Sequence, residues 1–278
     1  MPTPPHITNL APLAANYDSL LCDAWGVIHN GVDLFPGARE ALERFRAERG
    51  PVIILTNAPR PSSIIPPQLD RLGLPRAAYD FVVTSGDATR AAIMARLPAP
   101  AYRIGPEKDD KLYEGVDARF TPLGEAKFIV CSGLVNDQRE TPEDYRALLT
   151  EAAARALPMI CANPDVVVRW GGRLVYCAGA LAQLYEALGG EVIYGGKPHA
   201  PIYELALRRI EEARGAPVAK PRVLAVGDGV ATDILGANAQ GVDAVFVTDS
   251  DGVHEGDAET ALAKAGATAV AVMERLQW

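Results

Sequence analysis

The clearest pattern in the chain is a short apolar run followed by a stretch of helical periodicity, repeated at both ends of the sequence. We predict strands at the apolar runs, which occupy residues 19–22, 52–55, 81–83, 223–226 and 244–247. We predict helices where apolar residues recur every three or four positions, at 36–50, 64–72, 88–97, 202–213 and 234–240. Apolar strands that alternate with helices are typical of a parallel sheet covered on both faces, so the two ends of the chain predict an α/β fold.

The middle of the chain, from Tyr102 to Pro198, follows a different pattern. It mixes predicted helices at 143–157 and 179–188 with short strands at 128–130, 166–170 and 174–176. The sequence Trp-Gly-Gly-Arg at 170–173 is typical of a hairpin turn, so we expect antiparallel pairing here. We therefore predict a doubly wound, Rossmann-like core at 1–88 and 183–278, with an α/β cap domain inserted at 89–182.

Composition narrows the classes of protein that this chain can belong to. Hydrophobic residues make up 49% of the 278 residues, enough for a packed core, and 27 Lys+Arg face 35 Asp+Glu. The net charge of −8 argues against a protein that is dedicated to binding nucleic acid or an anionic membrane. No window reaches the roughly 18 apolar residues that a membrane helix needs. A small anionic substrate would still need local positive charge.

Cysteine usage and the first residues bear on the compartment. The four cysteines are scattered within apolar runs and form no C-x-x-C pair, so we expect reduced, buried thiols rather than a zinc site: Cys22, Cys131, Cys161 and Cys177. The first ten residues have neither a basic start nor a long apolar run, so no signal peptide is expected. Together these features predict a cytoplasmic protein.

Polar residues follow the predicted core strands, or in the case of Lys197 precede a predicted helix, at the edge where an open parallel sheet binds its ligand. They are Asp23, Thr56, Asn57, Lys197, Asp228 and Asp233. Carboxylates of this kind suit Mg²⁺, which takes one or two protein carboxylates and completes its shell with water and phosphate. Nucleotide motifs fail when checked: Glu191 stands where a Walker loop needs its first glycine, and Thr232 where a dinucleotide fingerprint needs its last.

The strand-end residues, in this order along the chain, resemble the four motifs of the haloacid dehalogenase-like hydrolases. The sequences Leu-Thr-Asn at 55–57 and Ala-Asn-Pro-Asp at 162–165 further resemble the class of that family with a large α/β cap between its second and third motifs. The p-nitrophenyl phosphatases and NagD-like proteins belong to this class. The resemblance covers nearly the whole chain and implies a Rossmann-like core, a cap, and a Mg²⁺-dependent phosphatase activity on a small phosphorylated metabolite.

The resemblance also implies a role for each motif residue. Asp23 would be the nucleophile that forms an aspartyl-phosphate. Asp23, Asp228 and the backbone carbonyl of Trp25 would hold Mg²⁺, and Asp233 would order its water shell.

The remaining motif residues would bind the phosphoryl group. Thr56 would donate its hydroxyl and Asn57 its backbone N–H, and Lys197 would pair with both Asp23 and the phosphate. Caps of this class can supply dimer contacts, so a homodimer is compatible with the resemblance.

One residue departs from the family pattern. Active members usually carry a second Asp two positions after the nucleophile, where it protonates the leaving group, but this chain has Trp25. The chain resembles a branch of the class with tryptophan at this position. An indole cannot act as a general acid near neutral pH. Four alternatives follow: a slow phosphatase, a phosphatase for a good leaving group, a phosphotransferase with another acceptor, or a metal- and phosphometabolite-binding or regulatory protein without turnover.

Other residues near the motifs could act in place of the missing acid or contact the substrate. His29 could replace the missing acid, because it follows Asp23 by six positions. Trp25 itself fits core packing and substrate contact equally well. Asn163 and Asp165 in the insert are predicted to fix a turn rather than to touch substrate.

Overall fold

The computed structural model describes residues 3–170, 173–248 and 257–278. The strands are β1 (Ser19–Cys22), β2 (Val52–Thr56), β3 (Phe81–Thr84), β4 (Ala101–Ile104), β5 (Phe128–Cys131), β6 (Met159–Cys161), β7 (Val167–Trp170), β8 (Arg173–Tyr176), β9 (Val192–Tyr194), β10 (Val223–Gly227), β11 (Asp243–Val247) and β12 (Ala271–Met273). The α-helices are α1 (Ala11–Ala14), α2 (Ala38–Glu48), α3 (Ile65–Leu72), α4 (Ser85–Met94), α5 (Arg146–Ala154), α6 (Ala178–Ala187), α7 (Ala200–Arg214), α8 (Leu235–Gln240) and α9 (Ala258–Ala265).

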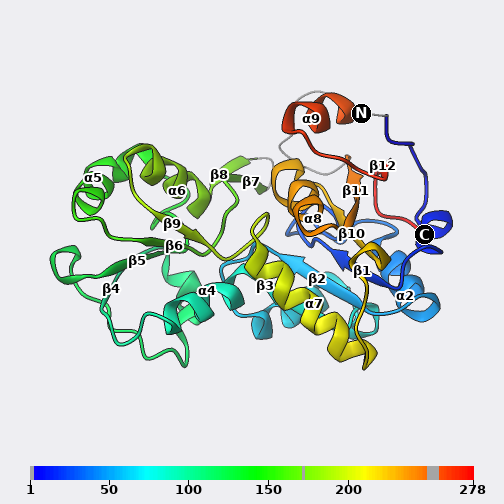
Figure 1. Ribbon diagram of the computed structural model, residues 1–278, viewed down its shortest axis with the longest axis horizontal. Coiled ribbons are helices and arrows are strands. Elements are labelled where there is room, and N and C mark those ends of the chain that lie inside the picture. The colour runs from blue at the N-terminus through cyan, green and yellow to red at the C-terminus, as the bar shows by residue number, and fades with distance from the viewer. Residues whose placement is uncertain (1–2, 171–172, 249–256) are drawn as a thin grey trace.

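A parallel sheet of six strands, in the order β12-β11-β10-β1-β2-β3, forms the larger lobe, here called the core domain (Figure 1). Successive side chains of each strand enter two different apolar clusters, because neighbouring residues of a strand point to opposite faces. Leu20 and Ile54 pack with α2 and α3, whereas Leu21 and Ile53 pack with α7, α8 and α9. Both faces are covered, which confirms the predicted doubly wound α/β fold.

The strand order places the ligand site. From β1 the chain moves outward through β2 to β3, and it later returns to β10 on the other side of β1. The order therefore reverses beside β1, and a crevice opens at the carboxyl ends of the strands on either side of such a reversal. The loops after β1, β2 and β10 all meet there.

The smaller lobe, here called the cap domain, contains a parallel sheet in the order β4-β5-β6-β9 and the antiparallel hairpin β7-β8. Helices α5 and α6 cover one face of the parallel sheet. Ile93 of α4 packs on the other face, while α4 also contacts α7 of the core domain. Helix α4 therefore lies between the two lobes.

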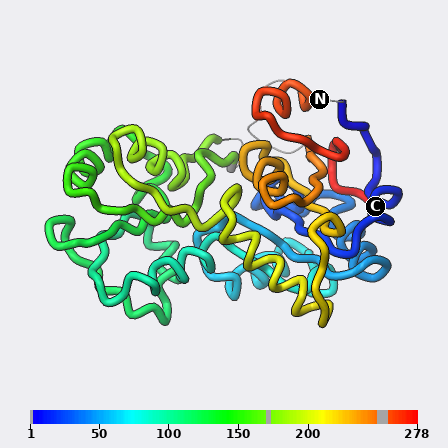
Figure 2. The backbone as a smooth tube through the Cα atoms, in the orientation of Figure 1, coloured from blue at the N-terminus to red at the C-terminus, as the bar shows by residue number. Residues whose placement is uncertain are grey.

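The chain crosses between the lobes twice (Figure 2). It leaves the core domain through α4 and returns in the segment between β9 and α7. The predicted boundaries at 88/89 and 182/183 fall inside α4 and α6, and at the residue level they stay predictions. Lys197 lies on the returning segment, beside the crossing.

The predicted elements are present, with their ends shifted by a few residues. The predicted hairpin corresponds to β7 and β8, although residues 171–172 of its turn lie outside the described residues. Sequence patterning missed β4, β6, β9, β12 and α9, and so missed most of the parallel sheet of the cap. Three of these strands (β6, β9 and β12) have only three residues, which is too short a run for periodicity to separate a strand from a loop.

The remaining expectations concern cysteines and membranes. All four cysteines are free and buried, as predicted. Over the part of the chain that the structure describes, no helix is both long and apolar enough to cross a membrane.

Candidate active site

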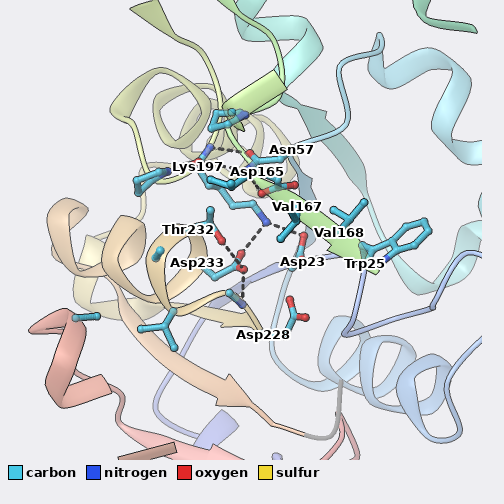
Figure 3. Close-up of a pocket in the computed structure, with 18 of the residues that line it drawn as sticks. Asp23, Trp25, Asn57, Asp165, Val167, Val168, Lys197, Asp228, Thr232 and Asp233 are labelled. Carbon is cyan, nitrogen blue, oxygen red and sulfur yellow. Dashed lines mark hydrogen bonds and ion pairs between the residues drawn. The ribbon is translucent and has the colours of Figure 1, made fainter. Parts of the chain in front are cut away.

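Lys197 and two carboxylates form a buried ion-pair network at the carboxyl end of the core sheet. The Nζ of Lys197 donates to Oδ1 of Asp23 at 2.6 Å, to Oδ1 of Asp233 at 2.6 Å, and to the carbonyl oxygen of Leu55 at 3.0 Å. These contacts use all three donors of the ammonium. Figure 3 shows the Lys197 side chain extending between Asp23 and Asp233.

Burial and charge act in opposite directions on this network. Lys197 is 2% exposed and burial alone lowers its pKa, but Asp23 and Asp233 outweigh that effect and hold the pKa well above the ordinary value. Burial raises the pKa of Asp23, and the Lys197 ammonium opposes the rise. The ammonium therefore stays charged and stabilises the carboxylate beside it.

Asp23 is held by the sheet itself. It directly follows β1, and its backbone N–H donates to the carbonyl of Val226 in β10 at 2.9 Å. The main chain of Asp23 thus continues the parallel ladder, and its side chain leaves the sheet at the strand end.

Three carboxylates gather here as the sequence predicts. Asp23, Asp228 and Asp233 each offer an oxygen, and these oxygens lie within 4.8 Å of one another. Asp233 sits on a π-helical turn, Val230–Ile234, where its Oδ2 accepts from the N–H of Gly229 at 3.0 Å. Gly26 adopts a left-handed φ of 83°, and a Cβ there would overlap the Asp228 carboxylate. The three-carboxylate donor set fits Mg²⁺, which prefers oxygen ligands.

Thr56 and Asn57 end the neighbouring strand, β2, and both are buried. The Thr56 hydroxyl accepts from the N–H of Ala58 at 3.3 Å, so its own proton can be donated to a ligand. The side chain of Asn57 has a role that sequence reasoning missed. Its amide contacts both the backbone of Lys197 and the carboxylate of Asp165 in the cap domain.

Trp25 is half-buried, with its ring packed against its own loop. Its ring meets the His29 ring edge-on, with centroids 5.5 Å apart, and covers Gly31 so closely that a Cβ there would overlap it. Trp25 also lines the cavity above Asp23. It therefore packs against its own loop and forms part of the cavity wall, and its contact with substrate stays a prediction (Figure 3).

His29 does not fit the role of replacement acid. The side chain is buried, its Nδ1 accepts from the N–H of Gly31 at 3.0 Å, and burial lowers its pKa to about 4. The ring is therefore neutral near pH 7 and has no imidazolium proton to give.

Comparison with known proteins gives the family. Two family models match the chain: one for haloacid dehalogenase-like hydrolases at residues 20–119 and one described as HAD-hydrolase-like at 194–277. The crystal structure of a haloacid dehalogenase-like family hydrolase from Brucella suis 1330 is 43% identical, with a TM-score of 0.90, over 97% of this chain and 99% of that one. The chain belongs to the haloacid dehalogenase-like hydrolases.

Curated relatives in this hydrolase family are more distant. The 5′-nucleotidase YutF of Bacillus subtilis (strain 168) is 26% identical over 83% of this chain and 87% of its own length. The ribonucleotide monophosphatase NagD of Escherichia coli (strain K12) is 25% identical over 82% of this chain and 86% of its own length. Both relatives span the core and cap domains together.

The cavity of this hydrolase has a volume of about 980 Å³ and lies between the two lobes. Its floor consists of the strand-end residues, and its cap-side wall includes the hairpin residues Val167, Val168 and Leu174. Sequence reasoning missed this apolar wall, because the pattern of a hairpin does not show what lies opposite it. The cavity is far larger than a phosphate group, so a bound phosphomonoester would bring its leaving group against the cap.

Proposed function

We propose that this hydrolase is a Mg²⁺-dependent phosphatase that cleaves a small phosphorylated metabolite through an aspartyl-phosphate on Asp23. The observation that carries the proposal is the buried carboxylate of Asp23, paired with Lys197 beside Asp228 and Asp233. The names of the two curated relatives, a 5′-nucleotidase and a ribonucleotide monophosphatase, describe hydrolases of phosphate monoesters and support the same reaction class.

In the first step, Asp23 attacks the phosphorus atom. Lys197 occupies Oδ1 of Asp23, so we assign the attack to Oδ2. A new bond forms between that oxygen and phosphorus, and the bond from phosphorus to the leaving-group oxygen breaks. Thr56 and the backbone N–H of Asn57 would donate to the phosphoryl oxygens, on which negative charge gathers.

In the second step, water attacks the phosphorus of the aspartyl-phosphate. A bond forms between the water oxygen and phosphorus, the bond between Asp23 and phosphorus breaks, and the proton that the water loses passes to the phosphate or to solvent. Inorganic phosphate leaves, and the carboxylate is restored. Lys197 stabilises the carboxylate as it leaves. Asp23, the carbonyl of Trp25 and Asp228 would hold Mg²⁺, and Asp233 would order its water shell. The bound cation would offset the repulsion between the Asp23 carboxylate and the phosphate.

A second candidate function, binding of a metal and a phosphometabolite without turnover, rests on Trp25. The indole N–H cannot protonate the leaving group, and such a proton transfer is typically worth about 10²–10⁴-fold in rate. Without it, a leaving group must depart as an anion or take its proton from water. Turnover is the property that separates the two candidates.

The first prediction tests turnover directly. With Mg²⁺ present, we expect hydrolysis of p-nitrophenyl phosphate, and we expect Asp23→Asn to lower kcat by at least about 10³-fold, because an amide is not a nucleophile. EDTA should abolish the wild-type rate, and added Mg²⁺ should restore it. Phosphate release is the measurement.

Asp18→Asn is the matched control, because Asp18 stands beside the opposite end of β1 and pairs with Arg222 at the surface. It should leave kcat unchanged. A background rate that is the same in wild type and Asp23→Asn would contradict the phosphatase proposal and leave the binding function.

A further inference from the structure

A turn of the cap domain reaches into the candidate active site. Residues 163–165 form this turn, in which Oδ1 of Asn163 accepts from the N–H of Asp165 at 3.1 Å. The carboxylate of Asp165 then extends to the core domain, where its Oδ1 accepts from Nδ2 of Asn57 at 2.8 Å. The predicted turn is therefore present, and its last side chain also forms a hydrogen bond between the two lobes.

The turn at 163–165 packs tightly against the backbone of the cap domain on one side and of the core domain on the other. The carbonyl of Asp165 accepts from the N–H of Gly179 at 3.1 Å, and a Cβ on Gly179 would lie 2.1 Å from the carbonyl oxygen of Pro164. On the core side, a Cβ on Gly196 would lie 2.8 Å from Cδ of Pro164 and 2.5 Å from Oδ1 of Asn57. Both glycines allow an approach that no other residue could make without displacement, so the position of Asp165 is well determined.

The orientation of the Asn57 amide follows from its partners. Its Oδ1 accepts from the N–H of Lys197 at 2.8 Å, and its Nδ2 donates to the carbonyl of Lys197 at 3.1 Å. A backbone N–H can only donate, so Oδ1 must face it and Nδ2 must face the carbonyl and Asp165. The Asn57 amide thus forms hydrogen bonds with both the N–H and the carbonyl of Lys197. Asp165 accepts a hydrogen bond from the same amide.

Lys197 depends on this support because its own segment has little regular structure. It lies between the end of β9 at Tyr194 and the start of α7 at Ala200, directly after Gly195 and Gly196. Consecutive glycines leave a backbone with many accessible conformations. The Asn57 amide constrains this segment together with the hydrogen bond from the N–H of His199 to the carbonyl of Gly196.

We propose that Asp165 is a positioning residue, which fixes the Asn57 amide and through it the placement of the Lys197 ammonium on Asp23. Because Asp165 belongs to the cap domain and Asn57 to the core domain, the placement of Lys197 is coupled to the position of the cap. The proposal rests on the phosphatase function for its kinetic test, although its structural test does not.

A different role for Asp165 would be proton donation. Asp165 lines the cavity, and burial raises its pKa, so a protonated carboxyl could stand in for the acid that Trp25 lacks. Asp165→Asn separates the two roles. The carbonyl oxygen of the new amide can still accept from Asn57, but the amide cannot act as an acid.

The kinetic test uses the full-length protein with Mg²⁺ and p-nitrophenyl phosphate. We expect Asp165→Ala to lower kcat by about 10–100-fold with KM changed less than about threefold, because a small displacement of a catalytic group costs that much in rate. We expect Asp165→Asn to retain kcat within about threefold of wild type. An equal loss in both variants would overturn the positioning role.

A double-mutant cycle tests whether Asp165 acts through Asn57. The double variant Asn57→Ala/Asp165→Ala should be no slower than Asn57→Ala alone, because residues that act through one contact are not additive. Multiplicative losses would overturn the proposal. Asp144→Ala is the matched control, since Asp144 is a cap carboxylate in the capping box with Thr141, and its loss should lower Tm and leave kcat unchanged.

A crystal structure of Asp165→Ala gives a test that needs no turnover. We expect the Asn57 amide to leave its orientation and the distance from Nζ of Lys197 to Oδ1 of Asp23 to exceed 2.6 Å. An unchanged amide and ion pair would overturn the proposal. An inactive wild type with the expected displacement would instead refute the phosphatase function and leave the positioning role standing.

Discussion

At the scale of single residues, the properties of the site depend on two neighbours of Asp23, namely Lys197 and Trp25. Lys197 pairs with both carboxylates of this network, Asp23 and Asp233, and its burial keeps water from screening their attraction. The residue two positions on, Trp25, contributes an apolar ring where the family usually has an acid. In the proposed reaction, Asp23 would be the nucleophile and Lys197 its charge partner, and the leaving group would depart without a proton from position 25.

Trp25 leads to a prediction about leaving groups. We expect kcat/KM of the wild type to fall steeply from aryl to alkyl phosphates, because a poorer leaving group departs more slowly as an anion. Trp25→Asp should flatten this dependence and raise the ratio of alkyl to aryl kcat/KM by about 10²-fold. The measurement is kcat/KM against leaving-group pKa.

Trp25→Phe is the control for lost packing on Gly31 and His29. It keeps an aromatic ring and adds no acid, so its slope should match that of the wild type. The ratio of two substrates also cancels any general loss of folded protein. Parallel slopes for wild type and Trp25→Asp would contradict the view that Trp25 is a missing acid.

At the scale of elements, the site depends on how closely α6 approaches the turn at 163–165. Gly179 lies in the first turn of α6, where its N–H donates to the carbonyl of Asp165. In an ordinary exposed helix, alanine would be favoured over glycine by about 1 kcal/mol. Here a Cβ would overlap two backbone carbonyls, which cannot move aside as a flexible side chain could.

We therefore expect Gly179→Ala to destabilise the protein by roughly 1–3 kcal/mol, against its helix propensity, because overpacking against backbone forces a shift. The same shift would move Asp165 away from Asn57, so kcat should fall as well. Thermal unfolding and steady-state kinetics measure the two effects. Gly124→Ala, where nothing lies within 4 Å of the added Cβ, should change neither; a Gly179→Ala variant as stable as wild type would show that α6 can move freely.

At the scale of the whole molecule, the two lobes also interact through charge. Asp109 of the cap domain is 3% exposed, and burial raises its pKa to about 6, although the positive charges of Arg60 in the core domain and Lys108 oppose the rise. The folded protein therefore holds the Asp109 proton more tightly than the unfolded chain does. The penalty for its charged form is absent below about pH 4, grows as the pH rises towards 6, and is complete above that.

Asp109→Asn removes this penalty. We expect the substitution to raise the free energy of unfolding more at pH 8 than at pH 5, by about 1 kcal/mol, from a penalty that totals roughly 2–3 kcal/mol. Chemical denaturation at the two pH values measures it. Any cost of burying the amide is the same at both pH values. A gain in stability that does not depend on pH would contradict the shifted pKa of Asp109.

The sequence by itself determined the α/β class and the residues that meet at the sheet edge. Asp23, Thr56, Lys197, Asp228 and Asp233 could be selected because each follows a strand or precedes a helix, and parallel strands bring their carboxyl ends together. That inference needs only local pattern and the rule of parallel connection. It could also identify Trp25 as a departure, because position relative to Asp23 is a property of sequence.

Only the tertiary structure decided what the side chains do to one another. Asn57 and Asp165 are 108 positions apart, and their hydrogen bond depends on how the cap is seated on the core. The same is true of the burial that makes His29 neutral and raises the pKa of Asp109. Such contacts join segments that no periodicity relates, and a hydrogen bond forms or fails over a few tenths of an ångström, so they follow from packing rather than from pattern.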